Sequence, residues 1–143
     1  MADKKTNLQE DEQVNEKPRS EKLKSAAEKE FKRLKNLYHK KGEDGKKKLA
    51  IDKNKFDALL GLMKQTAFMS AQLDALAEEL YEVGVVEEYK NGQNQFGKKE
   101  STQSKSYNAI IKNYITAIKT LADCTPEAEI KDELMEFLKG RKK

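Results

Sequence analysis

The feature that most limits how this chain can fold is a long run without proline, from residue 54 to about residue 90. Within this run, apolar side chains recur at alternating intervals of three and four residues, which is the heptad spacing of packed α-helices. The positions of this seam are Leu59, Leu62, Thr66, Met69, Leu73, Leu76, Leu80 and Val83, and only the threonine is polar. Such a sustained pattern predicts one long helix.

A second apolar stripe lies beside the seam on the same predicted helix. It consists of Phe56, Leu60, Met63 and Ala67. A helix with two apolar stripes packs against more than one neighbour. One hairpin partner would cover one stripe, so we expect the other to meet a further subunit. The alternative is that both stripes are buried in a bundle that this chain forms alone.

Two further helices are predicted on either side of the long one. A helix over residues 20–41 follows from the spacing of Leu23, Ala27, Phe31, Leu34 and Tyr38, and a glycine ends it. A third helix begins near residue 104 and carries a second seam, whose positions are Tyr107, Ile111, Tyr114, Ile118 and Leu121. The polar stretch 91–104 starts with Asn-Gly and reads as a turn.

Matching seams on consecutive helices around this turn predict an antiparallel helical hairpin over residues 51–124, which we expect to be the oligomerisation core. No segment has the composition or alternation of a strand, so the expected fold class is all-α. Residues 1–19 are expected to form a disordered acidic tail, because their hydrophobicity is low and they lack periodicity. Residues 125–143 are expected to form a short helix and a basic tail, since Thr125-Pro126-Glu127 is a helix start signal.

Charge is distributed unevenly along the chain, whose net charge is +4. Residues 17–48 hold 13 lysines and arginines against five acids, while residues 49–95 hold four lysines and eight acids. A basic block beside an acidic one is typical of a protein that binds a polyanion, most simply nucleic acid. Within the basic segment 20–50, the residues expected to contact DNA are Lys32, Arg33, Lys35, Lys40, Lys41, Lys46, Lys47 and Lys48. The alternatives are a lysine-rich surface that is merely solvated, or DNA contact by Lys98, Lys99 and Lys105.

Several function classes are disfavoured by composition. Charged residues reach 38% of this chain, against about 25% in an average soluble domain. The single cysteine, Cys124, and the single histidine, His39, are too few for a usual structural zinc site. A cysteine–histidine or serine–histidine nucleophile would have to use His39, which lies in a lysine-rich run and is a poor candidate. We therefore expect no catalytic residue, no metal and no cofactor. Neither a secretion signal nor a run of ~20 apolar residues is found, so neither secretion nor membrane insertion is expected.

Taken in order, these elements resemble the small terminase subunits of tailed bacteriophages, a family that initiates DNA packaging. The resemblance covers roughly residues 28–130. It consists of a short helix such as EFKRLKNL, an Asp-led long helix over 51–86, a turn with a central Asn-Gly in 87–101, and a closing segment over 104–127. The most distinctive parts are Asn91-Gly92, Tyr107-Asn108, Lys112-Asn113 and Thr125-Pro126.

The resemblance implies a non-enzymatic protein in the cytoplasm of an infected bacterium. It would form a homo-oligomeric ring, bind double-stranded viral DNA and recruit the large terminase subunit, which carries the ATPase and nuclease. The expected oligomerisation residues are Leu59, Leu62, Met69, Leu73, Leu76, Leu80, Val83, Ile111, Tyr114 and Ile118. The expected docking residues for the large subunit, on a short amphipathic helix, are Ile130, Leu134, Phe137 and Leu138. Phage and phage-satellite origins both remain open.

Two other functions remain open at this stage. One is a dimeric helical DNA-binding regulator, and the other is a structural coiled-coil scaffold. The chain has only three arginines, and basicity that comes mostly from lysine suits phosphate contact better than base recognition. This favours the packaging protein over the regulator, while the scaffold would have no use for the basic block.

Overall fold

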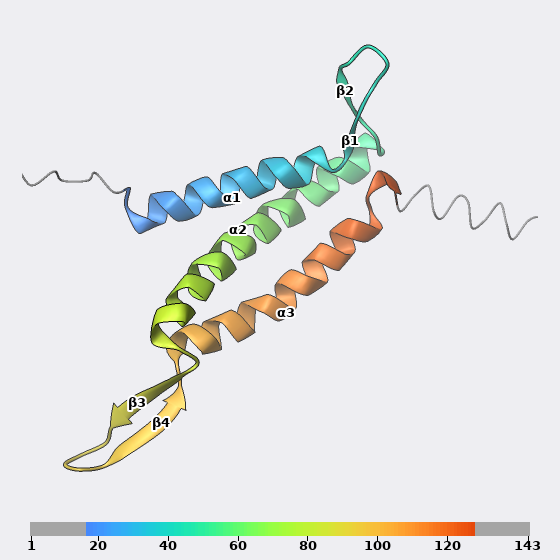
Figure 1. Ribbon diagram of the computed structural model, residues 1–143. Helices are drawn as coiled ribbons and strands as arrows, with labels where there is room; N and C mark the ends of the chain where they lie inside the picture. Colours follow the sequence, from blue (N-terminus) through green and yellow to red (C-terminus); the bar gives the residue numbers. More distant parts are fainter. Residues whose placement is uncertain (1–16, 128–143) are drawn as a thin grey trace, which may run out of the picture.

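The computed structural model describes residues 17–127, which form three packed helices and two small antiparallel hairpins (Figure 1). The helices are α1 (Arg19–Asn36), α2 (Lys53–Val83) and α3 (Thr102–Asp123). The strands are β1 (His39–Lys41) and β2 (Lys47–Leu49), between α1 and α2, and β3 (Val86–Lys90) and β4 (Phe96–Glu100), between α2 and α3. Each hairpin therefore replaces a simple interhelical loop.

Helix α2 is the centre of the molecule, because α1 and α3 each pack along it (Figure 1). Its first turn is capped by Asp52, whose carboxylate accepts the N–H of Lys55 at 3.1 Å. It ends at Gly84, whose φ of +80° suits glycine. Helix α3 begins after Ser101, whose hydroxyl accepts the N–H of Ser104 at 3.2 Å. The three helices predicted before residue 125 and the packing of the second against the third are confirmed.

The expectation of an all-α chain is wrong at both interhelical connections. Helix α1 ends at Asn36 rather than residue 41, and α2 ends at Val83 rather than about residue 90. The residues beyond each end form strands. Both hairpins reverse through residues with positive φ, at Gly45 in the first and at Gly92 and Asn94 in the second. Their strands are rich in charge, so the alternation that marks a half-buried strand is missing from the sequence.

The hydrophobic core lies where the end of α1, the start of α2 and the end of α3 meet. It is formed by Leu34, Tyr38, Ile51, Met63, Ala67 and Leu121. Tyr38 is completely buried, and its hydroxyl donates a 2.6 Å hydrogen bond to the carbonyl oxygen of Leu121. Burial raises the pKa of Tyr38 to about 12. This one side chain therefore fixes the base of the β1–β2 hairpin to the far end of α3.

The two stripes of α2 have different partners within the chain. Met63 and Ala67 of the second stripe are buried in the core that α1 completes. This stripe therefore needs no further subunit, which agrees with the alternative that one chain buries both stripes. The seam is covered less completely: Thr66 and Leu73 are buried and Val83 is 42% exposed. The half-buried seam positions on α2 and α3 are Leu59, Leu62, Met69, Leu76, Leu80, Tyr107, Ile111, Tyr114 and Ile118.

Some of the predictions concern residues that the structure does not describe. Residues 1–16, most of the expected acidic tail, are outside the described part, as are the docking positions Ile130, Leu134, Phe137 and Leu138. Among residues 17–127, no helix is both long and apolar enough to span a membrane.

Candidate nucleic-acid interface

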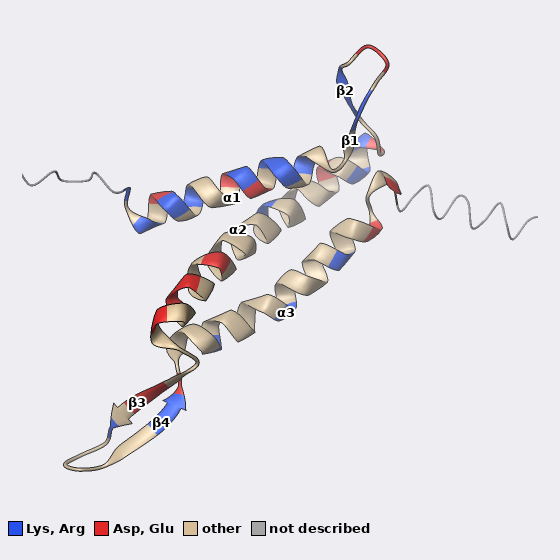
Figure 2. Ribbon diagram, in the orientation of Figure 1, with Lys and Arg blue, Asp and Glu red and all other residues tan. Residues whose placement is uncertain are grey.

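The β1–β2 hairpin concentrates positive charge on a segment that projects from the helices (Figure 2). Residues 40–48 include five lysines, and all five are exposed. These are the predicted DNA-binding residues Lys40, Lys41, Lys46, Lys47 and Lys48. The structure therefore gathers five of the eight predicted residues on one small element.

Strand register places these lysines against one another. Lys40 lies directly opposite Lys48, and Lys41 lies directly opposite Lys47. Residues directly opposite in an antiparallel pair are about 4.5–5.5 Å apart at Cβ, and like charges at this distance are destabilising. None of these four side chains forms an ion pair with another residue of the described segment 17–127. The hairpin thus carries positive charge that the described residues leave uncompensated.

The turn of the hairpin is tightly defined. The N–H of Gly45 donates to the carbonyl of Gly42 at 3.0 Å, and the N–H of Gly42 donates to the carbonyl of Lys46 at 2.9 Å. Gly45 has a φ of +74°, as expected for the left-handed residue of a three-residue hairpin loop. The Asp44 carboxylate accepts the backbone N–H of Lys46 at 3.2 Å. It therefore supports the turn and leaves the lysine ammonium groups of the strands unpaired.

The base of the hairpin is held by the core. The N–H of Ala50 donates to the carbonyl of Tyr38 at 2.8 Å, next to the buried Tyr38 ring. The His39 ring stands edge-on to Phe56, with 5.4 Å between the ring centroids, and its Nδ1 lies 2.8 Å from the carbonyl of Lys35. The single histidine is thus used in packing. A charged ribbon with an anchored base is well suited to present lysines in a defined arrangement.

The three predicted residues on α1 differ in their availability. Lys32 is exposed. Arg33 forms a hydrogen-bonded ion pair with Glu30, in which Nε lies 2.9 Å from Oε2, and the hydrogen bond to Glu30 raises the pKa of Arg33. The ammonium of Lys35 lies 4.4 Å from the centroid of the Phe31 ring. Arg33 and Lys35 therefore already have partners on α1, and the β1–β2 hairpin is the better candidate surface.

Two of the three alternative lysines lie opposite acidic residues, whereas the third, Lys105 on α3, is exposed. In the β3–β4 hairpin, Glu87 lies opposite Lys99 and Glu88 lies opposite Lys98. The Lys99 ammonium is 3.3 Å from a carboxylate oxygen of Glu87 and 5.8 Å from the centroid of the Tyr89 ring. This hairpin compensates its own charge, which makes it a poor surface for a polyanion.

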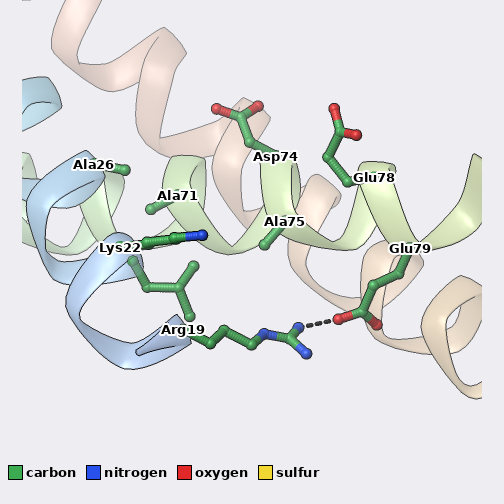
Figure 3. Close-up of a pocket in the computed structure, with 9 residues that line it drawn as sticks. Arg19, Lys22, Ala26, Ala71, Asp74, Ala75, Glu78 and Glu79 are labelled. Carbon is green, nitrogen blue, oxygen red and sulfur yellow. Dashed lines mark ion pairs between the residues drawn. The ribbon is translucent and has the colours of Figure 1, made fainter. Parts of the chain in front are cut away.

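A pocket between α1 and α2 is also lined by charged residues (Figure 3). Its floor is formed by alanines, among them Ala71 and Ala75. Arg19 of α1 pairs with Glu79 of α2, whereas Asp74 and Glu78, which also line the pocket, point away from this ion pair (Figure 3). In the part of the chain that the structure describes, no group of three histidine, cysteine or acidic side chains could hold a metal ion. We assign no ligand chemistry to this pocket.

Comparisons with protein-family models, curated proteins and solved structures found no match to this chain. The geometry of the lysines, which sequence reasoning missed, is therefore the main guide to function. A signal for it is present in the sequence, because Asp44-Gly45 between two lysine runs is a common hairpin turn pair.

Proposed function

We propose that this chain is a non-catalytic DNA-binding protein of the small terminase type. It would bind double-stranded viral DNA through the β1–β2 hairpin and recruit the large terminase subunit to begin genome packaging. The observation that carries the DNA-binding part is the pairing of Lys40 with Lys48 and of Lys41 with Lys47. Duplex DNA carries about one negative charge per 1.7 Å of its axis. Bound phosphates would therefore supply the negative charge that the hairpin lacks.

Incomplete cover of the α2–α3 seam supports assembly into a homo-oligomeric ring. Leu76 and Leu80 on α2 are half-buried, as are Tyr114 and Ile118 on α3, and Ile115 is 46% exposed. A second copy packed against this side of α2 and α3 would remove apolar surface from water. Such burial stabilises an assembly by about 25 cal/mol per Å². A ring would also repeat the lysine hairpin around one DNA molecule, so that individually weak sites gain avidity.

Recruitment of the large subunit rests on the family resemblance and on the apolar spacing of Ile130, Leu134, Phe137 and Leu138. An amphipathic segment of this kind suits a groove on a partner protein. Truncation after Glu127 should leave the oligomer intact and abolish stimulation of the large subunit's ATPase. Stimulation equal to that of the full chain would remove the docking proposal.

The DNA-binding proposal is tested by two triple variants with equal changes in charge. Lys46, Lys47 and Lys48 are replaced by glutamine in the first, and Lys98, Lys99 and Lys105 in the matched control. Affinity for double-stranded DNA is measured across a salt series, where each lost phosphate contact flattens log K against log salt by about 0.9. We expect the first variant to bind more weakly with a flatter slope, and the control to match the parent. Parental affinity and slope in the first variant would remove the hairpin from the DNA-binding surface.

Assembly is tested on the unmodified protein by native mass spectrometry at micromolar concentration. A closed oligomer larger than a dimer is expected. A dimer would favour the DNA-binding regulator, and a folded monomer would eliminate the ring.

A further inference from the structure

The β1–β2 hairpin is positively charged on both faces. Successive residues of a strand point to opposite faces, and residues directly opposite on paired strands share a face. Lys40 and Lys48 therefore share one face, and Lys41 and Lys47 share the other. All four side chains are exposed. Each face of the paired strands thus presents one pair of like charges, and Lys46 adds a fifth positive charge next to the turn.

A flat polyanionic surface would supply counter-charges to only one of the two lysine pairs. If the ribbon lay with one face on such a surface, the ammonium groups of that face would gain counter-charges and the opposite pair would continue to repel. Both pairs are compensated only when negative charge lies on both sides of the ribbon. The grooves of duplex DNA have this property, because each is bordered by two phosphate backbones.

The dimensions of the grooves distinguish between them. Stacked sheets are about 10 Å apart, which is the thickness of one sheet with its side chains. The major groove is ≈ 12 Å wide and ≈ 8.5 Å deep, while the minor groove is only ≈ 6 Å wide. Two strands separated by about 4.8 Å also fit within the depth of the major groove.

We infer that the β1–β2 hairpin lies edgewise in the major groove of double-stranded DNA, so that Lys40 and Lys48 face one phosphate backbone and Lys41 and Lys47 face the other. The inference rests on the proposed DNA-binding function and specifies how the same surface is used. Paired strands that are anchored at one end, beside Tyr38, hold the two lysine pairs on opposite faces without a contribution from the DNA.

The acidic tip of the hairpin fits this orientation. Glu43 and Asp44 lie at the turn and are exposed. A tip that pointed at a phosphate backbone would be repelled. A tip that points along the groove stays clear of both backbones, and base edges there include the amino groups of cytosine and adenine, which donate hydrogen bonds.

The test compares two double variants with the same change in charge on different faces. One carries Lys40→Gln and Lys48→Gln, and the other carries Lys41→Gln and Lys47→Gln. Both should lose affinity for double-stranded DNA to a similar extent, and each should flatten the slope of log K against log salt by about 1.8, or two contacts at 0.9 each. Because the four side chains are exposed, both variants should fold, which circular dichroism melts would verify.

A second measurement identifies the groove. A duplex whose cytosines carry bulky substituents at C5, which project into the major groove, should bind the parent protein more weakly. The same duplex with a minor-groove ligand such as netropsin should bind normally. Loss of affinity in only one double variant, or competition by netropsin alone, would overturn the edgewise inference and leave the DNA-binding proposal standing. Parental affinity in both double variants and in the Lys46–Lys48 triple variant would overturn both.

Discussion

The two hairpins of this molecule have the same architecture and opposite charge designs. Each is a two-stranded antiparallel ribbon between helices, and each reverses through a glycine with positive φ. The β1–β2 hairpin pairs lysine with lysine, whereas the β3–β4 hairpin pairs Glu87 with Lys99 and Glu88 with Lys98 (Figure 2). The strand lysines of β1–β2 need negative charge from outside the described residues 17–127, while Lys98 and Lys99 of β3–β4 lie opposite acidic residues of the same hairpin.

Their attachments to the helices differ as well. The β1–β2 hairpin is held by the buried ring of Tyr38. The β3–β4 hairpin is held by the hydroxyl of Ser101, which donates to the carbonyl of Gly84 at 2.7 Å, and it projects with Val86 54% and Phe96 71% exposed. A neutralised ribbon with exposed apolar residues suits contact with protein. A lysine ribbon on a rigid base suits contact with DNA.

Truncating Tyr38, which anchors β1–β2, and Tyr89, which lies on β3, should give the largest contrast between the two hairpins. Tyr38→Ala leaves a cavity in the core and should lower the free energy of unfolding by roughly 3–5 kcal/mol. Tyr89 is 41% exposed, so Tyr89→Ala should cost less than about 1 kcal/mol. Urea denaturation monitored by circular dichroism measures both values. Equal losses would contradict the expectation drawn from the different burial of the two tyrosines.

The helices and the two hairpins differ in how well they could be predicted from the sequence. The three helices were predictable, because large apolar residues such as Leu73 and Leu121 recur at helical spacing and end up buried. The strands were not, because β1 and β2 consist mostly of lysine and have no apolar alternation. The cover of the second stripe of α2 was foreseen only as the alternative to a further subunit. It depends on Leu34 and on Tyr38 just beyond α1, both outside the predicted helical hairpin.

The candidate site was predictable in composition and not in geometry. The density of lysine in residues 40–48 points to a polyanion. That Lys40 faces Lys48 depends on strand register, which is set by the three-residue turn and by the anchored base. Neither could be derived from charge alone, although the Asp44-Gly45 pair marked the turn.

High pH should loosen the β1–β2 anchor specifically. Burial raises the pKa of Tyr38 to about 12, while an unfolded tyrosine titrates near 10. The folded chain therefore holds the phenolic proton longer than the unfolded chain. This contribution to stability is complete below about pH 10 and falls by roughly 2–3 kcal/mol as the pH rises to 12. Urea denaturation of the parent and of Tyr38→Phe between about pH 9 and 12 gives the free energy of unfolding of each. The difference between the two proteins should shrink as the pH rises, and a difference that stays constant would contradict the prediction.

Substituting the glycines should separate backbone strain from side-chain crowding in the two ribbons. Gly45 has a φ of +74° and open space around it, so Gly45→Ala should cost about 1–2 kcal/mol from the left-handed backbone alone. In the other ribbon, a Cβ on Gly97 would lie 2.6 Å from the Tyr89 ring. Because that ring is partly exposed, it can swing outward, and Gly97→Ala should cost less than Gly45→Ala. Amide hydrogen exchange in each ribbon measures local opening; the reverse order would contradict this account.

Exchanging the charge designs of the two ribbons should give the smallest effect on stability. Lys41→Glu places a carboxylate opposite Lys47, and we expect it to stabilise β1–β2 by roughly 0.2–1 kcal/mol. Glu87→Lys places a lysine opposite Lys99, breaks their ion pair and should destabilise β3–β4 by a similar amount. Hydrogen exchange at low salt measures both shifts. They should shrink at 1 M salt, where the screening length is about 3 Å.

The Lys41→Glu substitution should have opposite effects on the stability of its hairpin and on the affinity for DNA. Lys41→Glu should strengthen its ribbon and weaken binding to double-stranded DNA, because it replaces a phosphate-binding ammonium with a repelled carboxylate. Glu87→Lys should destabilise β3–β4. Combined with Lys41→Glu, it should not restore the lost DNA affinity, because the added lysine lies on the other hairpin. A Lys41→Glu protein that is both more stable and equally tight on DNA would show that the lysine pairs serve no anionic partner. Their mutual repulsion would then lack a functional explanation.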